Sequence, residues 1–142
     1  MPKPLKALAA KAPITRTYVQ TAAAGTAPDG FIFVNPTGSG EYYEITEASC
    51  IYDVVGSTSA AADVKVVPSG TALASGTSAL ASTFDLTATA RTPRQATLSS
   101  TAGNRMVPPG SSVAVDTSGT LTGLTGLVVQ ITLRPVRGIH SR

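Results

Sequence analysis

Charged and aromatic residues are scarce in this chain, and tryptophan is absent. Charged residues make up 13% and aromatic residues 5% of its 142 residues, whereas an average soluble domain is about one quarter charged. Ser, Thr, Gly and backbone must therefore cover much of the surface, a composition that suits contacts with other proteins. Nucleic-acid-binding proteins usually place Lys and Arg beside aromatic residues on one face. The shortage of aromatic residues thus argues against direct nucleic-acid binding.

Histidine and cysteine each occur once, at His140 and Cys50. A zinc site needs several such ligands, and a catalytic triad needs a histidine held inside the fold rather than three residues from the chain end. We therefore expect no enzymatic activity, no metal or other cofactor, and no small-molecule substrate. Cys50 lies in the segment Ala48-Ser49-Cys50-Ile51-Tyr52, which indicates a small buried side chain in a strand.

Long apolar runs and phosphate-binding motifs are also missing. No apolar segment approaches the roughly 20 residues that span a bilayer, so we expect no membrane partner. Gly119, Gly123 and Gly126 are followed neither by a helical pattern nor by Lys, and they predict a turn rather than a phosphate-binding loop. Glu41, Glu44 and Glu47 lie in a strand-like segment, which indicates a solvated or partner-facing edge rather than an acid/base pair.

Positive charge is concentrated at the two ends of the chain. The formal net charge is +3, but the first 16 residues hold four cations and no acid, and Asp29 to Asp85 is predominantly acidic. We interpret residues 1–13 as an extended basic arm and 136–142 as a tail, although a disordered solubilising segment is the alternative. The side chains predicted to bind a capsid partner or another copy are Lys3, Lys6, Lys11, Arg16, Arg134 and Arg137.

Short segments rich in β-branched residues and separated by Gly, Pro, Asn and Ser predict strands throughout the body of the chain. The expected strands are 14–21, 31–34, one bent or two separate strands within 42–55, 62–67, 87–90, 96–99, 112–116 and 127–133. We expect 31–34 to be buried on both faces and 62–67 to be half-buried. Residues 71–83 predict a long connection, or a helical turn near 79–82, that crosses one end of the sandwich.

Seven to nine short strands without a confident helix predict an all-β fold. We expect a single jelly-roll-like antiparallel β-sandwich over residues 14–135. Few charges protect an edge strand such as 14–21 from unwanted pairing, so we expect a partner or an arm to cover it in the assembled state.

Several motifs in the region from Val64 to Pro135 resemble those of the small head decoration and cement proteins of tailed bacteriophages. The motifs are residues 70–77, 84–88, 104–105, 109–110, 113–116 and 127–133. The resemblance implies a jelly-roll subunit made in the bacterial host cytoplasm and carried on the outer capsid surface. It further implies a homodimer, with a trimer left open, that bridges major capsid proteins and stabilises the capsid. It supplies no catalytic residues.

A carbohydrate- or receptor-binding β-sandwich of a phage fibre or tail is the alternative function. Sugar sites usually present exposed aromatic rings for stacking. Tyr42 and Tyr43 form the one adjacent aromatic pair that could serve this purpose.

Overall fold

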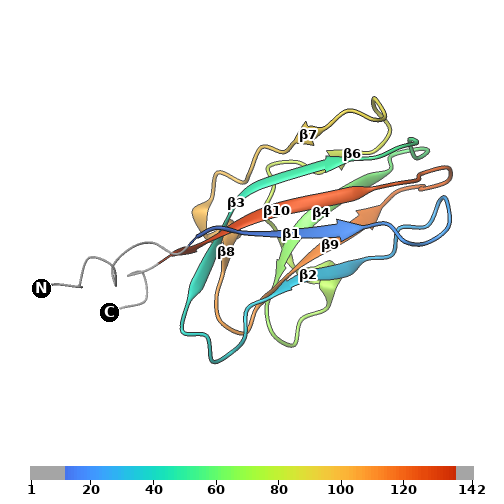
Figure 1. The fold of residues 1–142 in the computed structure, drawn as a ribbon. Helices are drawn as coiled ribbons and strands as arrows, with labels where there is room; N and C mark the ends of the chain where they lie inside the picture. Colours follow the sequence, from blue (N-terminus) through green and yellow to red (C-terminus); the bar gives the residue numbers. More distant parts are fainter. Residues whose placement is uncertain (1–11, 137–142) are drawn as a thin grey trace, which may run out of the picture.

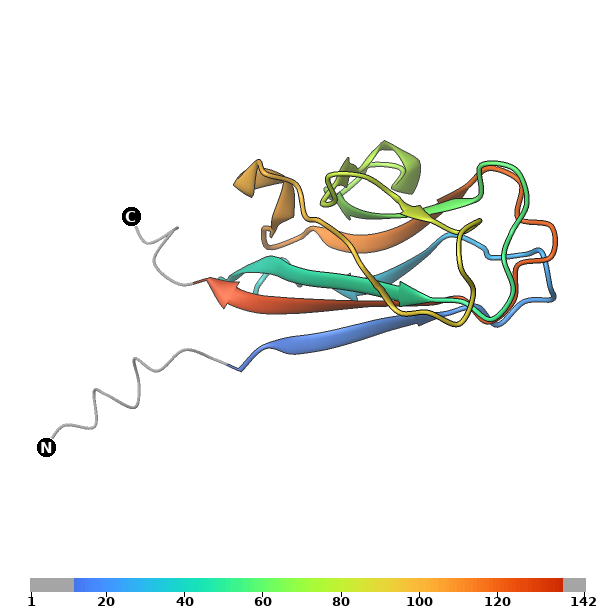
Figure 2. The same ribbon diagram turned by 90° about the horizontal axis from the view of Figure 1, so that it is seen from above.

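Two antiparallel sheets packed face to face form the body of the protein in a computed structural model that describes residues 12–136 (Figures 1 and 2). Two short 3₁₀ turns, Leu73–Ser75 and Ala102–Arg105, interrupt the strands. The strands are β1 (Ile14–Val19), β2 (Gly30–Val34), β3 (Tyr42–Ile51), β4 (Ala61–Val67), β5 (Thr77–Ser78), β6 (Phe84–Asp85), β7 (Arg94–Gln95), β8 (Met106–Val107), β9 (Ser112–Ser118) and β10 (Val128–Val136).

The strands pair in a nested order. The first sheet runs β1-β10-β3-β7 with β8 also on β3, and the second runs β2-β9-β4-β5 with β6 also on β4. Thus β1 pairs with β10, β2 with β9, β3 with β8 and β4 with β5, all antiparallel. A long hairpin folded over into two sheets gives this order, which is that of a jelly roll. The predicted all-β jelly-roll-like sandwich is confirmed.

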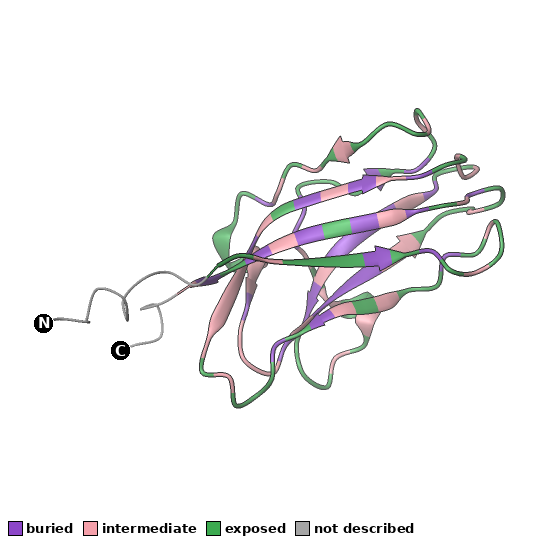
Figure 3. Cartoon of the chain, in the orientation of Figure 1, coloured by how far each residue is buried: buried purple, intermediate pink, exposed green. Residues whose placement is uncertain are grey.

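The core lies between the two sheets and follows the two-residue period of their strands. In β10, Val129, Ile131 and Leu133 are fully buried and alternate with the more accessible Val128, Gln130 and Thr132 (Figure 3). Valines of β4 and β9 close the core from the second sheet. Cys50 in β3 is 4% exposed, which confirms its interpretation as a buried side chain in a strand.

Residues 42–51 form one long strand, which settles the choice between one strand and two. A register shift opposite Thr132 and Leu133 places the extra residue Thr46 in β3, and this bulge bends the strand. The strand ends at Ile51, earlier than the predicted 55. At the other end of the sheet, β10 continues through Pro135 to Val136, past the start of its neighbour β1.

The outer face of β4 is covered, so the prediction that 62–67 is half-buried was wrong. Val67 is 2% exposed, and Asp63 is 9% exposed and accepts a hydrogen bond from the Ser78 hydroxyl at 2.6 Å. Lys65 pairs with Asp116 at 2.6 Å and donates to the carbonyl of Ala74. The segment after β4 therefore folds back over the second sheet.

Four further predictions for the middle of the chain were wrong. The helical turn lies at Leu73–Ser75 rather than near 79–82, where Leu80 instead bridges Leu98. Residues 87–90 form a turn, and the predicted strand 96–99 is replaced by the two-residue strand β7. The segment after β4 stays with the second sheet as far as β6, and the chain crosses to the first sheet after that strand. This part of the chain is rich in small residues with weak local preferences. Packing against the rest of the protein therefore decides its structure more than local propensity does.

Candidate protein-interaction surface

Strand β2 is an edge strand with two exposed apolar side chains. Phe31 is 56% and Val34 65% exposed, so the expectation that 31–34 is buried on both faces was wrong. A bulge explains why both side chains point outward: Phe31 lies opposite Ala114 and Phe33 opposite Val113, which leaves Ile32 as the extra residue. Without the bulge, residues three apart would lie on opposite faces.

Strand β1 is the edge of the first sheet on the same side of the sandwich. It pairs with β10, and its Val19 is 53% exposed. Gln20 donates its backbone N–H to Leu127 at 2.8 Å. Because successive residues of a strand point their N–H groups in opposite directions, Thr15 and Thr17 direct theirs toward the open edge. One side of the sandwich therefore carries two edges without a strand partner among the described residues (Figure 1).

The predicted partner-binding arginines take different positions. Arg16 on β1 is exposed, its guanidinium lies 5.8 Å from the centre of the Phe33 ring, and it donates to the Thr15 carbonyl. It therefore lies beside the open edges. Arg134 instead forms an ion pair at 2.9 Å with Glu44, which also holds Arg105 at 3.2 Å.

Glu44 and Glu47 differ in their surroundings. Glu44 is largely buried within the arginine pairs, which corrects its interpretation as part of a solvated or partner-facing edge, whereas Glu47 is exposed on the outer face of β3. Tyr43 packs edge-to-face against Phe33 with ring centres 5.1 Å apart. Tyr43 thus belongs to the packing between the sheets rather than to a sugar-stacking platform.

Lys3, Lys6, Lys11 and Arg137 lie outside the described residues, as do His140 and most of the predicted arm and tail. Both of these ends nevertheless join the body at one place, because Ile14 pairs with Leu133 near the end of β10. Residues 12–136 hold six Lys or Arg and eight Asp or Glu, which gives a formal net charge of −2. The two ends hold five Lys or Arg and no acid, which gives a formal net charge of +5. A basic region is therefore attached at one end of an acidic body.

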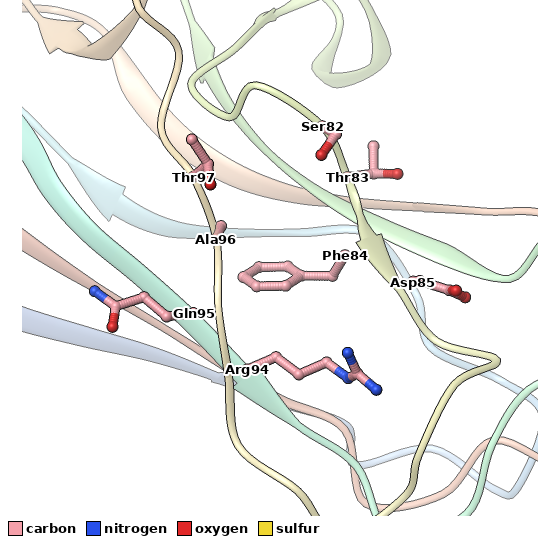
Figure 4. Close-up of a pocket in the computed structure, with 8 residues that line it drawn as sticks. All are labelled: Ser82, Thr83, Phe84, Asp85, Arg94, Gln95, Ala96 and Thr97. Atoms are coloured by element: carbon pink, nitrogen blue, oxygen red, sulfur yellow. The ribbon is translucent and has the colours of Figure 1, made fainter.

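A small cavity lies on the side of the sandwich away from β1 and β2. About 230 Å³ in volume, it is lined by residues 82–85 and 94–97 (Figure 4). Hydrogen bonds from the Thr87 side chain and backbone, and to a smaller extent the charge of Arg94, lower the pKa of Asp85. This site has no signature in the sequence, because nothing in the local pattern shows that these two segments face each other.

Within residues 12–136, no three His, Cys, Asp or Glu side chains gather so that they could hold a metal ion. No helix among these residues is long and apolar enough to cross a membrane.

Comparison with known proteins gives a distant structural likeness. No family model and no curated protein matches the sequence. Among solved structures, the chain is similar to one chain of the cyanophage Pam1 capsid asymmetric unit, with 15% identity and a TM-score of 0.47 over 94% of this chain and 99% of that chain. A likeness this distant assigns neither a family nor a function.

Proposed function

We propose that the protein is a structural subunit of a tailed-phage virion that decorates the outer capsid surface and cements it by bridging major capsid proteins. The observation that carries the proposal is the open side of the sandwich, where β1 and β2 lack a strand partner among the described residues. Strand β2 has no charged residue, and it exposes Phe31 and Val34. Exposed edges of this kind bind extended segments of other chains or pair with another copy.

The charge distribution supports the same role. The basic ends join the sandwich beside the start of β1, so a partner bound at the open edge would also meet the predicted arm. A subunit held by both a sheet edge and an arm gains affinity from the second contact without needing a larger sandwich. Arg16, at the edge itself, contributes a cation to the same surface.

Co-sedimentation with expanded phage heads that lack this protein tests the proposal. The full-length chain should bind saturably at a fixed ratio to the shell subunit. The Phe31→Ser/Val34→Ser double variant should bind at least tenfold more weakly, and a chain starting at Ala12 should bind more weakly and with less dependence on salt. Val54→Ser is the matched control, because Val54 is also exposed, at 40%, but lies outside β1 and β2.

Two outcomes would contradict the proposal. Equal binding by the double variant and by Val54→Ser would remove the β2 edge from the interface. Failure to bind heads, together with binding to glycans or host cells, would favour the receptor-binding alternative instead.

A further inference from the structure

The cavity between β6 and β7 arises where two neighbouring segments separate. The Leu80–Leu98 bridge and the hydrogen bond from Ala81 N–H to the Thr97 carbonyl, at 2.8 Å, hold the segments together at one end. Beyond this point, β6 pairs with β4 in the second sheet and β7 pairs with β3 in the first. The segments diverge toward opposite sheets and leave the cavity between them.

Arg94 lines this cavity and forms no ion pair with any of the described residues. Its side chain extends past the ring of Phe84 toward Asp85 (Figure 4). The Nε atom is buried and has no hydrogen-bond partner among the described residues. Arg91, in contrast, forms an ion pair with Asp53 at 2.7 Å.

Asp85 lies near Arg94 but is engaged elsewhere. One of its carboxylate oxygens accepts the Thr87 backbone N–H at 2.9 Å and the Thr87 hydroxyl at 2.6 Å. Asp85 and Arg94 do not approach within ion-pair distance in the described structure. The guanidinium therefore remains available to an acceptor from outside.

We propose that this cavity binds the carboxylate of an acidic side chain, Asp or Glu, from a partner protein. A guanidinium binds a carboxylate through two parallel hydrogen bonds. The volume of about 230 Å³ is below that of a pocket for a drug-sized ligand and suits one side chain. The hydroxyls of Ser82, Thr83 and Thr97, which also line the cavity, can donate to the remaining lone pairs.

The charge of Asp85 favours a carboxylate over a phosphate as the ligand. With one Arg and one Asp, the cavity carries no excess positive charge, whereas sites that recognise phosphate groups gather several arginines. This contact would lie on the side of the sandwich opposite the β1 and β2 edges. It does not depend on the proposed virion role.

NMR of the arginine Nε–Hε groups of the full-length protein tests the proposal, with N-acetyl-glutamate N-methylamide as the probe. At constant ionic strength, the Arg94 signal should shift saturably with the probe, and it should shift at least threefold less with phosphate at the same concentration. The Arg91 signal should stay unchanged.

Variants of Arg94, with a control at Arg91, test whether the response to the probe depends on the Arg94 guanidinium. Arg94→Gln should weaken the response of the backbone amides of Ala96 and Thr97 to the probe at least tenfold, and Arg94→Lys should weaken it too because the two-bond geometry is lost. Arg91→Gln is the control and should respond as the unmodified protein does. The proposal would be overturned if chloride at the same concentration gave shifts as large as those with the probe. It would also be overturned if the Arg94 signal showed no saturable shift, or if Arg94→Gln bound the probe fully.

Discussion

At the scale of single residues, Asn35 joins the loop that follows β2 to strand β8. The residue is fully buried, and its amide donates to the carbonyls of Glu41 at 2.8 Å and Val107 at 2.9 Å. Its side-chain oxygen accepts the Ser39 hydroxyl at 2.7 Å. In the sequence, the pair Asn35-Pro36 is typical of a turn. The structure shows that it holds the end of β2 to β8.

Replacement of Asn35 by Ala should lower the free energy of unfolding by about 2–4 kcal/mol, because buried carbonyls lose their donors. Urea unfolding followed by circular dichroism measures the effect. Asn104→Ala is the matched control, since the Asn104 amide makes a single bond to the Ser99 hydroxyl in a more accessible position. That variant should lose less than about 1 kcal/mol. Equal losses would refute the role assigned to Asn35.

Burial changes the chemistry of Cys50 as well. Loss of hydration raises the pKa of its thiol from 9.0 to about 11, against a smaller opposite effect of Arg94. Above its own pKa the unfolded state releases the thiol proton, whereas the folded state keeps it. The stability that the buried thiol contributes is therefore fully present below pH 9. It is lost as the pH rises toward 11.

The stability difference between the unmodified protein and Cys50→Ala should therefore shrink between about pH 9 and pH 11. Denaturant unfolding at several pH values measures it. In the folded protein at pH 8, labelling of Cys50 by a thiol reagent should proceed through unfolding and speed up with denaturant. Rapid labelling without denaturant would contradict the buried thiol.

At the scale of elements, turns at the ends of strands set how closely the backbones of neighbouring strands approach within one sheet. Gly119 follows β9 with φ at +77°, and a side chain there would collide with the Ser59 carbonyl and lie 2.8 Å from the Ala60 nitrogen. Gly70, after β4, has nearly the same φ, +78°, but a Cβ would meet no atom within 4 Å. Alanine substitutions at these two glycines therefore separate the cost of backbone strain from the cost of steric collision.

Gly119→Ala should cost at least about 3 kcal/mol of unfolding free energy, whereas Gly70→Ala should cost about 1 kcal/mol from the left-handed conformation alone. Thermal or urea unfolding of both variants provides the measurement. Similar losses in the two variants would mean that the loop before β4 moves away easily and that the close approach is not required.

At the scale of the whole molecule, the nested strand order leaves β1 and β2 as edges on one side. In free protein at low concentration, the N–H groups of Thr15, Thr17 and Val19 should exchange with solvent much faster than those of the central strands β3 and β10. Hydrogen exchange read by NMR tests this. After assembly on its partner, the protein should show slowed exchange at these positions. Slow exchange in the free monomer would argue against an interface at this edge.

The sequence by itself determined the all-β class, the positions of β1, β9 and β10, the buried state of Cys50 and the asymmetry of charge. These follow from local patterns, because alternation of apolar residues and turn-forming residues acts within a few positions of the chain. Only the tertiary structure decided that Phe31 and Val34 are exposed, that Val67 is covered, and that Arg94 faces Asp85 across a cavity. Each of these depends on a bulge, a returning loop or the divergence of two distant segments, and contacts of that kind are fixed by packing between elements rather than by neighbouring residues.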